Sequence, residues 1–171
     1  YIDPVTPAPF AESIKNGVKQ WEKAFEAAGW KNVFRFSSDA KDASLSYRTI
    51  LFRWGSAYNG IYSSVIDNTV TGEILCARVN VMDVAADELV GMYFLHCGLL
   101  DGRIRKDLHS LAVRQDVLTA QVASAFAEVL KMKPNKAGYT VFTPANIRSE
   151  KWLNRYGITA SITSGVTFNY L

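Results

Sequence analysis

Apolar residues recur at intervals of three and four near the start of the chain. The positions that follow this spacing are Ile14, Val18, Trp21, Phe25 and Ala28. Residues spaced in this way share one face of a helix. Gly29 comes next, and glycine readily adopts the left-handed backbone that ends many helices. The pattern predicts an amphipathic helix that stops at Gly29 and packs its apolar face on a core.

Strand patterns follow this helix. Val33–Phe36 alternates, and Tyr47–Trp54 is rich in β-branched and aromatic residues, which favour strands. Ser63–Ile66 and Glu73–Val81 flank the segment Asp67–Gly72, whose Asp, Asn and Gly residues are typical of tight turns. These last two runs therefore predict a β-hairpin.

Helical spacing returns in the second half of the chain. The expected helices run from Asp83 to about Leu100, from about Leu111 or Gln115 to Lys133, and over Glu150–Tyr156. The second of these should end at Lys133 because a residue before proline disfavours helical backbone. A helix, then strands, then helices predicts a single α+β domain over residues 1–171.

Composition narrows the class of protein. The 171 residues are about one domain's worth, and 49% apolar with 20% charged residues is typical of a globular chain. The net charge of +3 is scattered, so it does not predict nucleic-acid binding. No run approaches the ~20 apolar residues of a membrane span. Because Tyr1 stands where Met would begin a chain, we expect either a processed product or a piece of a longer polypeptide.

Cysteine and histidine offer little chemistry. Cys76 and Cys97 are too few for a disulfide framework or a four-thiolate zinc site. We expect two buried apolar residues, with one bridge as the alternative in an oxidising compartment. His96 lies in an apolar helical stretch and is expected to be buried, whereas His109 lies in a polar connector. No short spacing joins them into a metal site.

Several segments carry a resemblance to a known family. They are Tyr1–Pro4, Gly17–Gly29, Val65–Asp67 with Thr71–Leu75, Met92–Phe94 with Asp101–Lys106, and Gly157–Ile162 with Phe168–Tyr170. Together they resemble secreted bacterial zinc-dependent metallopeptidases of the metzincin-like zincin type. The resemblance implies a zincin-like fold with an N-terminal helix, a twisted, mostly parallel sheet with an antiparallel edge strand, an active-site helix and a C-terminal Met-turn. It also implies a zinc cofactor and a secreted or periplasmic location.

The active-site helix of that family carries the motif His-Glu-x-x-His-x-x-Gly-x-x-His. Its histidines bind zinc and its glutamate acts as general base on the metal-bound water. At the motif positions this chain has, in order, Ser124, Ala125, Glu128, Lys131 and Pro134, and Thr163 stands at the Met-turn methionine. One carboxylate cannot form a three-ligand zinc shell. The resemblance therefore implies a pseudopeptidase, with no catalytic residue and no bound zinc expected.

Zincin folds hold a substrate along an exposed edge strand, and the resemblance assigns Glu73–Val81 to that edge. The binding residues would be Glu73, Leu75, Ala77 and Val79. Unpaired backbone groups at an edge can add a strand from a partner without any metal. We therefore expect a noncatalytic domain that binds a protein or peptide. The alternatives are an active zinc metallopeptidase with ligands from outside this chain, and a purely architectural domain whose cleft Lys131 helps to close.

Overall fold

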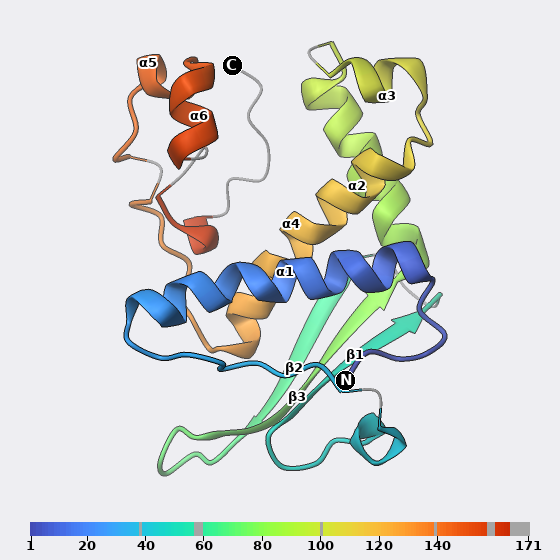
Figure 1. Ribbon diagram of the computed structural model, residues 1–171, viewed down its shortest axis with the longest axis vertical. Coiled ribbons are helices and arrows are strands. Elements are labelled where there is room, and N and C mark those ends of the chain that lie inside the picture. The colour runs from blue at the N-terminus through green and yellow to red at the C-terminus, as the bar shows by residue number, and fades with distance from the viewer. Residues whose placement is uncertain (38, 57–59, 100, 139, 157–159, 165–171) are drawn as a thin grey trace.

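The computed structural model describes residues 1–37, 39–56, 60–99, 101–138, 140–156 and 160–164 (Figure 1). Its elements in chain order are α1 (Ala8–Ala27), η1 (Ala40–Ala43), β1 (Thr49–Gly55), β2 (Ile61–Asp67), β3 (Ile74–Met82), α2 (Asp83–Cys97), α3 (Gly102–Lys106), α4 (Leu111–Val129), α5 (Pro144–Ile147), α6 (Glu150–Tyr156) and η2 (Ile162–Ser164). The α+β class is confirmed. No helix among the described residues is both long and apolar enough to cross a membrane.

The three strands form one mixed sheet in the order β1-β3-β2. β1 runs parallel to β3, with Phe52 opposite Val79, and β2 runs antiparallel to β3, with Ser63 opposite Val79. The antiparallel edge strand is therefore β2. The expectation that Glu73–Val81 forms the edge is wrong, because β3 is bonded on both sides.

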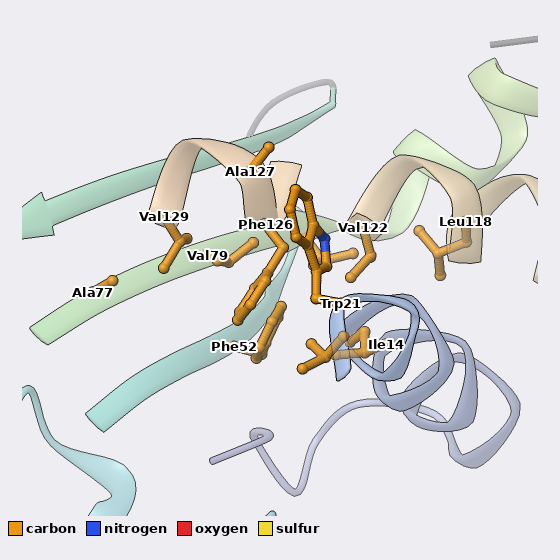
Figure 2. Close-up of a cluster of buried hydrophobic side chains, with 12 residues drawn as sticks. Ile14, Trp21, Phe52, Ala77, Val79, Leu118, Val122, Phe126, Ala127 and Val129 are labelled. Atoms are coloured by element: carbon orange, nitrogen blue, oxygen red, sulfur yellow. The ribbon is translucent and has the colours of Figure 1, made fainter. Parts of the chain in front are cut away.

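The core lies between one face of the sheet and the helices α1 and α4. Figure 2 shows Phe52 and Val79 of the sheet beneath Phe126 of α4, beside Trp21 of α1. The Phe52 and Phe126 rings stack with centroids 6.3 Å apart. The indole Nε1 of Trp21 donates a hydrogen bond of 2.8 Å to the Ala123 carbonyl oxygen. This bond joins α1 to the interior of α4.

α1 and α4 approach most closely at Gly17. A Cβ there would lie 2.8 Å from Val122 Cγ1 and 2.9 Å from the Thr119 carbonyl oxygen. Both distances are shorter than the ~3.5–4.0 Å of ordinary carbon contacts. Only glycine fits this crossing.

Several predicted elements are confirmed. α1 stops before Gly29, whose φ is +92°, and β2 and β3 form the expected hairpin. α6 spans Glu150–Tyr156 as predicted. Val33–Phe36, in contrast, belongs to no strand. Its alternation has another cause, because the Phe34 ring packs edge-on against Phe126 at 5.2 Å.

A polar network joins the end of α2 to α3 and α4. Arg103 pairs with Asp101 at 2.8 Å and with Asp116 at 2.7 Å, and the Tyr93 hydroxyl donates to Asp101 at 2.9 Å. Hydrogen bonds from Arg103 lower the pKa of Asp101 to about 2. Burial, together with Asp101, raises the pKa of Tyr93 to about 12. This network stabilises the turn between the helices.

The two cysteines are buried, whereas the two histidines are exposed. Cys76 and Cys97 are both buried and form no disulfide in the described part of the chain, as the first of the two alternatives predicts. His109 is exposed, and so is His96. The expectation of a buried His96 is wrong because α2 is apolar on all sides, so its sequence does not reveal which face is covered.

Candidate functional site

Two of the motif positions at the end of α4, Glu128 and Lys131, contact the edge strand β2. Glu128 Oε2 accepts a hydrogen bond of 2.7 Å from the Ser63 hydroxyl of β2. Ser124 lies one turn earlier on the same helix face and is half-buried, whereas the Ala125 methyl group is buried. The structure therefore brings Glu128 to the edge strand, with Ser124 one turn away along the helix.

α4 ends in a left-handed turn at Lys131, whose φ is +54°. The Lys131 N–H donates to the Glu128 carbonyl oxygen and the Met132 N–H donates to the Ala127 carbonyl oxygen, both at 2.9 Å. These two bonds form a Schellman motif, which usually has glycine at the left-handed position. The expected extension of the helix to Lys133 is wrong because the chain turns here. The motif that the chain resembles has its glycine at this same position.

The Lys131 side chain returns to the edge strand. Its Nζ pairs with Asp67 Oδ2 at 2.6 Å, with the two side chains 48% and 22% exposed. Two polar contacts, Ser63–Glu128 and Lys131–Asp67, thus tie the end of α4 to β2. We call these two contacts the α4–β2 clasp.

Thr163 lies beside the chain that follows the turn. The Asn135 N–H donates to the Thr163 carbonyl oxygen at 2.9 Å, and Pro134, the last motif position, is exposed next to it. Gly157–Thr159 and Phe168–Tyr170 of the expected Met-turn segment lie outside the described residues. Thr163 and Pro134, which the resemblance aligns with the Met-turn methionine and the last motif position, are therefore neighbours in space.

The side chains at these positions do not fit a zinc ion. Ser124 offers a hydroxyl and Glu128 a carboxylate that already accepts from Ser63, while Ala125 and Pro134 have no donor atom. Zinc sites in proteins use at least three nitrogen, sulfur or carboxylate ligands. Among the described residues no group of three or more His, Cys, Asp or Glu side chains could hold a metal.

The outer side of β2 presents backbone groups to solvent. The Gly60 carbonyl oxygen accepts from the Met82 N–H at 3.3 Å, which sets the alternation of the antiparallel ladder. By this register the N–H and C=O groups of Ile61, Ser63 and Val65 point away from β3. No backbone hydrogen bond with another described residue uses these outward groups.

The residues expected to bind a partner lie elsewhere. Ala77 and Val79 are 0% exposed beneath the helices, so neither can touch a peptide. Glu73 Oε1 accepts from the Tyr47 hydroxyl at 2.6 Å, and the Leu75 carbonyl oxygen accepts from the Arg48 N–H at 2.7 Å. The β2 edge, which the sequence interpretation did not select, is the accessible one. Burial alternates along Ile61–Asp67, but the residue types do not, so the sequence carried no clear signal for this edge.

A cavity of about 300 Å³ lies on the β1 side of the sheet. The residues at its rim include Phe34, Arg35, Phe36, Asp42 and Arg48. Its mixed aromatic and charged lining includes neither the motif positions nor β2, and no sequence pattern pointed to it.

Comparison with known protein families, with curated proteins and with solved structures finds no match to this chain.

Proposed function

We propose that this chain is a catalytically degenerate, metallopeptidase-like domain of zincin type that binds an extended protein or peptide segment along β2. The observation that carries the proposal is the left-handed backbone of Lys131, φ +54°. A lysine at such a φ is unusual, and the peptidase motif requires a glycine there. The helix face that would hold a metal in that motif is also the face that meets Ser63.

The proposal excludes peptidase chemistry by these residues. A zinc peptidase needs a general base beside the metal-bound water, and Ala125 supplies only a methyl group at that position. Glu128 is engaged by Ser63 at 2.7 Å. We therefore infer that this surface binds a protein or peptide without cleaving it. The resemblance implies a secreted or periplasmic location.

Strand addition at β2 is the mode of binding that the geometry favours. Ile61, Ser63 and Val65 have outward backbone groups, and no lysine or proline protects the strand against pairing. Tyr62 and Ile66 are 44% and 50% exposed on the face opposite α4. An added strand would pair with the outward groups and place its own side chains beside these two.

Two variants of one residue test this mode. Ser63→Pro removes an outward N–H from the edge strand, where proline is tolerated because the N–H faces solvent. Ser63→Ala keeps that N–H and removes only the hydroxyl that reaches Glu128. On an array of random twelve-residue peptides, followed by fluorescence polarisation of the peptides retained, Ser63→Pro should weaken binding by about tenfold or more. Ser63→Ala should leave it within about threefold.

Hydrogen exchange supplies an independent measurement. A bound peptide should protect the amides of Ile61, Ser63 and Val65. Equal binding by the two variants, or protection confined to other segments, would refute strand addition at β2.

One observation favours an architectural role as the second candidate. The α4–β2 clasp closes the motif surface with bonds inside the chain. If no peptide on the array binds the wild-type domain, the architectural role is the better account. Stoichiometric zinc in the purified protein would instead support an active peptidase.

A further inference from the structure

α2 has an apolar face that nothing in the described part of the chain covers. The helix packs on α4 through Val90, which clusters with Val113 and Val117. Its other side carries Met92 and Leu95, and Leu99 follows just after the helix ends at Cys97. The three side chains are 52%, 80% and 87% exposed. We call these three residues, together with Gly91, which directly precedes Met92, the α2 stripe. Three apolar side chains this exposed, gathered at the end of one helix, indicate an interaction surface.

The α2 stripe is charged oppositely at its two ends. Glu88 precedes it, is exposed and forms no ion pair with a described residue. At the other end Arg105 Nη1 donates to the Leu99 carbonyl oxygen at 3.3 Å, which holds the guanidinium beside the last leucine. Lys106 follows it and is exposed.

The middle of the stripe permits close approach. A Cβ built at Gly91 would meet no atom within 4 Å, so a side chain from a partner helix can lie directly on the backbone there. A surface with an apolar centre, one acidic end and one basic end is complementary to itself when it is turned by a twofold axis.

We propose that the occupant of the α2 stripe is a second copy of this chain, with the two α2 helices antiparallel about a twofold axis near Met92. In this pair Leu95 of each copy lies over Gly91 of the other. Glu88 of each copy meets the Leu99 end of the other, where Arg105 lies. The two ion pairs are equivalent by symmetry, and the helix dipoles oppose each other favourably.

The same features argue against a membrane as the occupant. Peripheral membrane helices border their apolar face with basic residues, whereas the acidic Glu88 stands at the first end of this one. Twofold pairing gives a role to both the acidic and the basic end of the stripe. Contact through the apolar residues alone would give these charged ends no role.

Sedimentation velocity over a concentration series tests the proposal. The wild-type chain should associate to a dimer, and Leu95→Glu should make it monomeric without changing the circular dichroism spectrum or the melting temperature of the monomer. A wild-type chain that stays monomeric throughout the series would overturn the proposal. So would a dimer that Leu95→Glu leaves intact.

A charge exchange tests the antiparallel arrangement. Glu88→Arg alone and Arg105→Glu alone should each weaken dimerisation by about tenfold, because each places like charges together. The double variant restores opposite charges and should return the affinity to within about threefold of wild type. A double variant weaker than both single variants would refute the pairing.

Phosphatidylglycerol vesicles complete the test. Sedimentation of the chain with these vesicles, abolished by Leu95→Glu in a protein that does not dimerise, would assign the stripe to a membrane instead. Neither β2 nor the turn at Lys131 takes part, so these outcomes are independent of peptide binding.

Discussion

Replacing Lys131 with glycine tests the turn on which the proposed relationship depends. A non-glycine residue in left-handed backbone costs about 1 kcal/mol, and Lys131 has a φ of +54°. The same substitution removes the pair between Lys131 Nζ and Asp67, whose lysine is 48% exposed. Ion pairs this exposed contribute about 0.2–1 kcal/mol. Lys131→Gly should therefore raise the free energy of unfolding by about 0.5 kcal/mol.

Lys131→Ala is the matched control. It removes the same ion pair but leaves a Cβ in the left-handed conformation, so it should lower the free energy of unfolding by about 0.5 kcal/mol. The difference between the two variants isolates the backbone and should be about 1 kcal/mol in favour of glycine.

Urea unfolding followed by tryptophan fluorescence measures both variants. Melting temperature gives a second readout, because about 1 kcal/mol corresponds to about 2–4 °C in a domain of this size. If the glycine and alanine variants are equally stable, the chain does not turn left-handed at Lys131. α4 would then continue toward Lys133, and the alignment of α4 with the peptidase motif would lose its support.

Three further substitutions, one of them with a control variant, test the core and the polar network. Gly17→Ala should lower the free energy of unfolding by about 1–3 kcal/mol, because its Cβ would lie 2.9 Å from a backbone carbonyl. In dilute protein the control Gly91→Ala should stabilise by about 1 kcal/mol, since its Cβ meets no atom. Trp21→Phe loses the 2.8 Å hydrogen bond to α4 and should cost about 2 kcal/mol by urea unfolding. Asp101 has its pKa lowered to about 2, so its contribution is present above about pH 4 and is lost as the pH falls toward about 2. Asp101→Asn should remove that pH dependence, which amounts to at most about 2 kcal/mol and less in salt because Arg103 is half-exposed.

The elements that the sequence predicts well are those whose signals are local. α1 shows its apolar spacing and its stop at Gly29 within one short window, and α6 is bounded in the same way. The hairpin of β2 and β3 has its turn residues between two apolar runs. Each pattern depends on neighbours in the chain, so no knowledge of the rest of the fold is needed.

Strand order is not local, and there the sequence interpretation failed. A hairpin sequence does not say which of its strands will meet β1. In the sequence, one face of β3 is apolar, but the other face carries Arg78 and Asn80. This composition resembles that of a strand with one solvated face, which fits an edge as well as a centre. The burial of Cys76 and Met82 on that second face emerges only in the folded structure.

The residue type at position 131 does not predict the left-handed turn. Lysine is a good helix former and rarely adopts a positive φ, so its identity predicts a continued helix. Tertiary contacts stabilise the turn instead. Lys131 Nζ pairs with Asp67, and the Asn135 N–H after the turn donates to the Thr163 carbonyl oxygen. Only the alignment with the peptidase motif marked this position as special.

Restoring the motif side chains tests whether the backbone still has the geometry for a metal. The variant combines Ser124→His, Ala125→Glu, Glu128→His, Lys131→Gly and Pro134→His. Because α4 already ends in a left-handed turn at position 131, the variant keeps the backbone conformation that the motif has there. It should therefore bind zinc in calorimetric titration. The control that keeps Pro134 lacks one ligand and should bind zinc about 10–100-fold more weakly. This is the loss in metal affinity that follows when a residue supporting a metal ligand is replaced. Equal affinities of the two proteins for zinc would show that the last position does not reach the ion. The turn would then be a coincidence of helix capping rather than the remnant of a metal site.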